Sequence, residues 1–169
     1  MQIIRQSQLV LALALALPCV ACGGPPQPPP PPPDTLDNVA WETVVSSPDE
    51  ECQPEILRVD RGDLNGDDAR EALVSWTCGA VTSGYPDVVD IYDGASRQGE
   101  PRIVGRALDE RSSGEERGSR VVNVVAGDGR ATIRANEYRP DDSNADPSVT
   151  VEYDVVVEAD RPVVTRRVV

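Results

Sequence analysis

Hydrophobic and polar residues alternate along much of the chain. In the segment 131–138, Ala131 and Ile133 alternate with polar side chains, and the segment 148–158 repeats the pattern with valines. A period of two places alternate side chains on opposite faces of a strand, so the pattern predicts a sheet with one face in water. Valine-rich runs between turn residues predict strands at 56–59, 71–77, 87–92, 102–107, 120–126, 131–138, 148–158 and 162–168.

Short polar segments join several of these strands. Gly127-Asp128-Gly129 and Ala159-Asp160-Arg161 are each short enough for a hairpin turn, which connects antiparallel strands. The segment 36–45 is compatible with a short helix or with a strand. We therefore predict a mainly β fold, an antiparallel meander or a small β-sandwich, formed by residues 35–169 as a single domain.

The N-terminal part of the chain has a different pattern. Arg5 precedes an unbroken apolar run at 9–17, which is typical of a signal peptide and is about half of the roughly 20 residues that a membrane-spanning helix needs. Val20-Ala21-Cys22 with two following glycines resembles a bacterial lipobox, in which the cysteine is acylated after cleavage. We expect residues 1–21 to be the signal peptide and Cys22 to carry the lipid. Lipidation at Cys19 and ordinary cleavage after Ala21 are the alternatives.

Residues 22–34 form a proline-rich linker that includes six consecutive prolines at 28–33. Such a run adopts polyproline II and rises about 3.1 Å per residue, so it holds the domain some 30 Å from its anchor. The expected location is extracytoplasmic, on a bacterial membrane through the lipid anchor. In a Gram-negative cell this would be the outer membrane or the cell surface.

The composition narrows the chemistry. The net charge of −13 opposes nucleic acid as a partner, because phosphate binding needs clustered positive charge. The chain has no histidine and all 16 basic residues are arginine, which excludes histidine-based triads, Schiff-base chemistry and histidine zinc sites. We predict a non-catalytic structural or binding module for a protein or glycan partner that the sequence does not identify. A hydrolase acting through paired carboxylates is an alternative.

Two cysteines remain after Cys19 and Cys22 are assigned to the N-terminal segment. Cys52 and Cys78 are expected to form a disulfide, because an oxidising compartment favours the bond. Closing this loop contributes on the order of 3 kcal/mol by the chain-entropy model. Two free buried thiols are the alternative.

The segment 60–74 carries the most informative pattern. Asp63, Asn65 and Asp67 stand at positions one, three and five of a loop, and Glu71 stands at position nine. Oxygen ligands at this spacing can surround one calcium ion, so a calcium-dependent recognition module is a second alternative function. The other interpretation is a loop of Asx turns, in which the carboxylates accept hydrogen bonds from their own backbone amides.

The same segment, Asp-Leu-Asn-Gly-Asp-Asp, resembles the calcium loop of FG-GAP and VCBS-type repeat modules. Together with Cys78-Gly79 and the run 86–93, it also resembles small secreted lipoproteins of mycobacteria and other actinobacteria. The second resemblance supports the pairing of Cys52 with Cys78 and the order of the strands, and it implies little about function. Asp68 stands where both patterns have glycine, and aspartate tolerates the left-handed turn expected there better than most residues.

Overall fold

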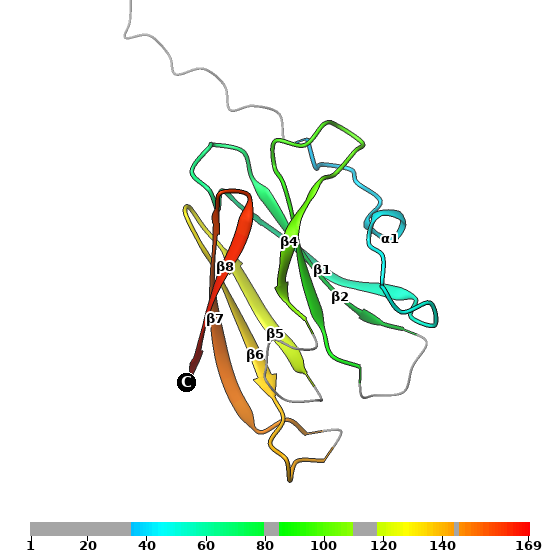
Figure 1. The fold of residues 1–169 in the computed structure, drawn as a ribbon, viewed down its shortest axis with the longest axis vertical. Helices are drawn as coiled ribbons and strands as arrows, with labels where there is room; N and C mark the ends of the chain where they lie inside the picture. The colour runs from blue at the N-terminus through cyan, green and yellow to red at the C-terminus, as the bar shows by residue number, and fades with distance from the viewer. Residues whose placement is uncertain (1–34, 80–84, 110–117, 144–145) are drawn as a thin grey trace, which may run out of the picture. The chain divides into compact units, whose positions relative to one another are not determined.

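The computed structural model describes residues 35–79, 85–109, 118–143 and 146–169. They form two four-stranded antiparallel sheets, each with its strands in sequence order (Figure 1). The mainly β antiparallel fold expected from the sequence is therefore confirmed. The strands are β1 (Pro54–Gly62), β2 (Glu71–Cys78), β3 (Val88–Tyr92) and β4 (Ile103–Leu108) in the first sheet, and β5 (Ser119–Ala126), β6 (Ala131–Glu137), β7 (Val149–Glu158) and β8 (Arg161–Val168) in the second.

The observed strands match the predicted ones, with differences at their ends. The largest difference is in β1, which extends beyond the predicted 56–59 because its backbone pairs with β2 along its whole length. The segment 36–45 contains a short helix, α1 (Trp41–Val44), so the helical alternative is correct. Among the described residues, no helix has the length and apolar character needed to cross a membrane. The expected signal peptide, Cys22 and the proline-rich linker lie outside the described residues.

The first sheet is covered on both faces. On its outer face, Ala72, Val74 and Trp76 of β2 pack in a buried cluster with Leu36 and Trp41 of the preceding segment. The predicted disulfide between Cys52 and Cys78 belongs to the same cluster, with a distance of 5.1 Å between the two Cα atoms. We call residues 36–52 the covering segment. The disulfide joins the end of this segment to the end of β2, so the covering segment is an integral part of the fold.

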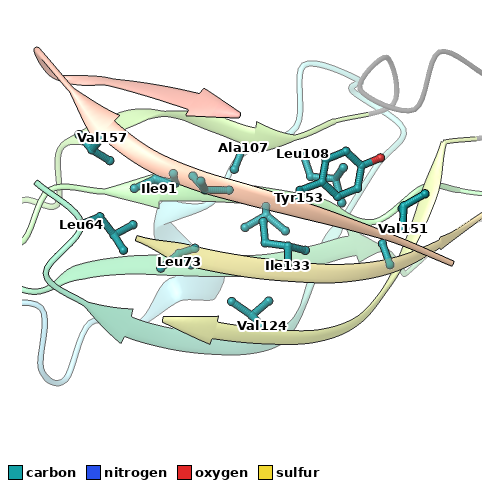
Figure 2. Packing of buried hydrophobic residues seen from close by; sticks show 14 residues of the cluster. Leu64, Leu73, Ile91, Ala107, Leu108, Val124, Ile133, Val151, Tyr153 and Val157 are labelled. Carbon is teal, nitrogen blue, oxygen red and sulfur yellow. The ribbon is translucent and has the colours of Figure 1, made fainter. Parts of the chain in front are cut away.

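The inner face of the first sheet packs against the second sheet. Figure 2 shows the side chains of this core, with Leu73 and Ile91 from the first sheet facing Ile133 from the second. Leu64, which follows β1, also enters the core and is 2% exposed. In Figure 2, Leu64 and Val157 lie at one end of this core, and Tyr153 lies toward the other end.

The second sheet has one wet face, as its alternating pattern predicts. Along β7, Val151, Tyr153 and Val155 are buried while the residues between them are partly exposed. On the outer face, Thr132 donates a hydrogen bond to Asp154 over 2.9 Å. Both predicted hairpin turns are present, because β5 pairs with β6 and β7 pairs with β8 in antiparallel register.

The edges of the two sheets also meet. From β1, the Arg58 guanidinium donates to the side-chain oxygen of Asn123 over 3.0 Å and to the carbonyl of Val124 over 3.2 Å, both in β5. At the other edge, a β-carbon on Gly105 of β4 would lie 2.7 Å from the Pro162 ring of β8. Glycine is therefore required at position 105 for β4 and β8 to approach this closely.

Candidate functional site

The loop between β1 and β2 is held firmly between the two sheets. The carbonyl of Asp63 accepts a hydrogen bond from Gly129 N–H over 2.6 Å, and the carbonyl of Leu64 accepts one from Val157 N–H over 3.3 Å. With the Leu64 side chain in the core, the loop is fixed against both hairpins of the second sheet. Its polar side chains are therefore presented in one defined arrangement.

Side chains within the loop determine its local shape. The two carboxylate oxygens of Asp63 accept hydrogen bonds from Gly66 N–H over 2.7 Å and from Asp68 N–H over 3.1 Å. The side-chain oxygen of Asn65 accepts one from Asp67 N–H over 2.9 Å. Asp68 has a φ of +67°, so the left-handed turn expected at this position is present. The Asn65 bond is that of an Asx turn, whereas the two bonds to Asp63 span three and five residues, and all of them leave further lone pairs on each oxygen.

Glu71 is the first residue of β2, and its carboxylate is completely buried. Its Oε2 atom accepts a hydrogen bond from Leu64 N–H over 2.6 Å. Its Oε1 atom is also buried, yet it has no hydrogen-bond partner among the residues that the structure describes. Burial raises the pKa of Glu71, the backbone hydrogen bond from Leu64 opposes this, and the negative charges of Asp67 and Asp63 raise it further.

Two further carboxylates lie close to Glu71. The last residue pair between β2 and β3 is Ala72 with Tyr92, and Glu71 and Asp93 each stand one residue beyond this pair along the chain. Asp67 approaches them from the β1–β2 loop. One carboxylate oxygen from each of the three residues lies within 4.8 Å of the others. We call Asp67, Glu71 and Asp93 the acidic triad.

Gly94 allows this convergence. A β-carbon on Gly94 would lie 2.5 Å from the backbone nitrogen and carbonyl carbon of Arg70, a distance that real β-carbons do not reach. Gly94 directly follows Asp93, and Arg70 directly precedes Glu71. The absence of a side chain at position 94 therefore brings the end of β3 against the start of β2.

Asp93 has its own partners in the β3–β4 connection. Its Oδ1 atom accepts a hydrogen bond from Ala95 N–H over 3.0 Å, and its Oδ2 atom accepts one from the Arg102 guanidinium over 2.8 Å. The Arg102 side chain is half-exposed, so water screens part of its charge. An open pocket of about 330 Å³ begins at Asp93 and is lined by Asp93, Ala95, Ser96, Arg97, Glu100 and Arg102.

A second open pocket, of about 510 Å³, lies beside the same loop. It is lined by acidic and basic side chains together with backbone of the β5–β6 turn, namely Arg61, Gly62, Asp63, Asp68, Arg70, Ala126, Gly127 and Asp128. This lining contains three aspartates and two arginines, so their charges partly offset one another. The acidic triad is the more distinctive site, because it contains a buried carboxylate oxygen for which the described part of the chain supplies no hydrogen-bond partner.

The structure brings together part of the set of ligands predicted from the sequence. Asp67 and Glu71 belong to the acidic triad, whereas Asp63 and Asn65 only shape the loop. Asp67 also takes part in the loop, because its carboxylate oxygens accept hydrogen bonds from the Asn65 amide over 3.2 Å and from Ala69 N–H over 2.9 Å. Asp93 is the residue that the sequence reasoning missed. In the sequence, Asp93 is visible only as an acidic residue directly after the strand predicted at 87–92. The pairing of that strand with the one at 71–77 is needed to place Asp93 beside Glu71.

No protein-family model, curated protein or solved structure matches the chain. The described residues define a two-sheet antiparallel β-sandwich with an acidic triad at the end of the first sheet where β2 begins.

Proposed function

We propose that this chain is a membrane-anchored, extracytoplasmic lipoprotein whose β-sandwich acts as a non-catalytic structural or binding module. The lipid on Cys22 anchors the protein, and the proline-rich linker holds the folded domain away from the membrane surface. The partner is a protein or a glycan, because the net charge of −13 opposes nucleic acid and anionic lipid surfaces.

The observation that carries this proposal is the Cys52–Cys78 disulfide. Disulfides persist in oxidising compartments outside the cytoplasm and are rare inside it. The bond lies in the buried cluster between the first sheet and its covering segment, where it contributes to the stability of the fold. A domain held together in this way is suited to the location that the N-terminal pattern predicts.

The side-chain chemistry supports a non-catalytic role. Without histidine or lysine, the chain lacks imidazole bases and amine nucleophiles, and only carboxylates, hydroxyls and arginine remain for catalysis. The buried carboxylate of Asp90 in the first sheet accepts hydrogen bonds from Trp76 and Arg106, which supports a structural role for it.

Metabolic labelling with a fatty-acid analogue tests the anchor. Bacteria expressing the full chain are expected to incorporate the label into it, and a Cys22→Ala variant is expected to lose the label. Cys19→Ala is the matched control and should keep it. An unlabelled wild-type chain would contradict the lipid anchor, and a labelled Cys22→Ala variant would contradict its assignment to Cys22.

An activity panel tests the non-catalytic role. The purified full chain, in detergent, is incubated with ester, glycan and peptide substrates. We expect no turnover above that of a heat-denatured sample. Reproducible turnover of any substrate, lost on replacement of a described carboxylate, would instead support a hydrolase.

A further inference from the structure

We propose that Asp67, Glu71 and Asp93 bind one calcium ion, which joins the β1–β2 loop to the end of β3. This inference goes beyond the anchored module proposed above, and neither proposal requires the other. It differs from a site formed within the loop alone, because Asp93 comes from a part of the chain more than 20 residues further on.

The first argument is the state of Glu71. A buried carboxylate oxygen without a partner costs free energy, because it has lost its hydration and gained nothing in return. Among the residues described, Oε1 of Glu71 is such an oxygen, and it belongs to the side chain that converges with Asp67 and Asp93. A cation bound by the acidic triad would supply the missing partner.

The second argument is geometric. Calcium binds carboxylate oxygens at about 2.3–2.6 Å, so two of its ligands lie no more than roughly 5 Å apart. The three oxygens of the acidic triad lie within 4.8 Å of one another, which fits within that limit. Magnesium is smaller and requires nearly ideal octahedral geometry at about 2.0–2.1 Å, so we expect it to bind more weakly.

The third argument is electrostatic. Like charges close together repel each other, and one carboxylate oxygen each of Glu71 and Asp93 lie within 4.8 Å of each other. Asp67 adds a third negative charge. The Arg102 guanidinium donates a hydrogen bond to Oδ2 of Asp93. Because Arg102 is half-exposed, it offsets only part of the repulsion between the three carboxylates. A divalent cation between the three carboxylates would remove the remainder.

The approach to the triad is open to ions. Asp67 is exposed, so it can meet a hydrated ion at the surface, while Glu71 forms the buried side of the site. Because the pocket of about 330 Å³ opens beside Asp93, water has room to complete the calcium shell. Asp63 and Asn65 act as positioning residues, since their hydrogen bonds to loop amides fix the place of Asp67.

The test uses the full chain purified in detergent. Isothermal titration calorimetry with calcium is expected to give one site with a Kd of about 10⁻⁴–10⁻³ M, the range of extracellular calcium modules. With calcium at about 100 times Kd, the melting temperature should rise by on the order of 8 °C over a sample in chelator. Magnesium at equal ionic strength should give a clearly smaller shift.

Two variants locate the site. Asp93→Asn should raise the Kd for calcium at least about tenfold, because it removes one charged ligand from outside the loop. Glu71→Gln keeps an acceptor for the Leu64 amide and removes the buried charge. It should therefore melt higher than wild type in chelator and lower than wild type in calcium. Asp128→Asn, in the exposed β5–β6 turn, is the matched control and should bind calcium like wild type.

If Glu71 is a calcium ligand, Glu71→Gln melts above wild type in chelator and below wild type in calcium. If Glu71 is only a structural carboxylate, the variant and wild type keep the same order of melting temperatures in both buffers. The proposal is overturned if calcium produces neither heat nor a change in melting temperature, or if magnesium acts equally well. It is also overturned if Asp93→Asn folds, as judged by circular dichroism, and binds calcium with unchanged Kd. These results would leave the labelling test of the anchor unaffected.

Discussion

The two sheets have the same number of strands and the same order, but they meet water differently. In the first sheet, β2 is buried at every position except Thr77, because one face packs on the second sheet and the other is covered by the segment that includes α1. In the second sheet, β7 alternates between buried and partly exposed residues, and β8 is exposed along nearly all of its length. Polar groups on the outer face of the second sheet are therefore more exposed to water than the polar groups of β2 and β3.

The candidate site follows from this difference. The acidic triad lies at the end of the first sheet, where Glu71 is buried by the core and by the loop that Leu64 fixes in place. On the outer face of the second sheet, Glu152 and Asp154 are also close to each other, but both interact with Arg167 and remain partly exposed to water. Neighbouring carboxylates there need no further partner.

The ion pair of Asp90 and the ion pair of Glu152 should give the largest contrast between a buried position in the first sheet and the wet face of the second. Asp90 in the first sheet is almost completely buried and accepts a hydrogen bond from Arg106 over 2.7 Å. We expect Arg106→Ala to lower the free energy of unfolding by about 3 kcal/mol, since it leaves a buried charge without its counterion. Arg167→Ala in the second sheet should leave the stability unchanged within error. Urea unfolding measures both, and equal effects of the two substitutions would contradict the comparison.

The disulfide should matter next most, and its loss should increase local opening most in the segment that covers the first sheet. Replacing Cys52 and Cys78 by serine is expected to lower the free energy of unfolding by about 3 kcal/mol, because the unfolded chain loses a constraint. Hydrogen exchange should then increase in α1 and in the segment before β1 more than in β6 and β7. An equal increase in both sheets would argue against a distinct covering segment. Mass analysis after alkylation, with and without reduction, checks that the bond is present in the wild type.

Two buried tyrosines should make the protein sensitive to high pH. Burial raises the pKa of Tyr92, beside the covering segment, and of Tyr153, between the sheets, to about 12. Both tyrosines ionise near pH 10 when the chain is unfolded, so the stability each contributes is complete below that pH and is lost as pH rises through 12. The loss is on the order of 3 kcal/mol per tyrosine.

Urea unfolding between pH 9 and 12 measures this loss. Tyr92→Phe and Tyr153→Phe should each flatten the decline in stability with pH, and the double variant should flatten it most. If Tyr153→Phe declines as steeply as wild type, the inter-sheet core does not hold this tyrosine in its neutral form.

Much of the fold could be predicted from the sequence, because the signals are local. Alternation in 131–138 and 148–158 indicates a strand with one wet face, and turn residues such as Gly127-Asp128-Gly129 separate the strands. The left-handed turn at Asp68 and the pairing of Cys52 with Cys78 were also predictable. The pattern of β2, which is apolar along most of its length, indicates burial but does not say what covers it.

What only the tertiary structure decided is how distant segments meet. The covering of the first sheet by residues before β1 depends on packing, which leaves no periodic signal in the covering segment itself. The acidic triad depends on the register that pairs Ala72 with Tyr92 and on the close approach of Gly94 to Arg70. Spacing within the loop predicted Asp67 and Glu71, because those residues are neighbours along the chain. Asp93 joins them because it directly follows a strand that pairs with β2, and the burial of Oε1 of Glu71, which has no partner among the described residues, exists only once the chain has folded.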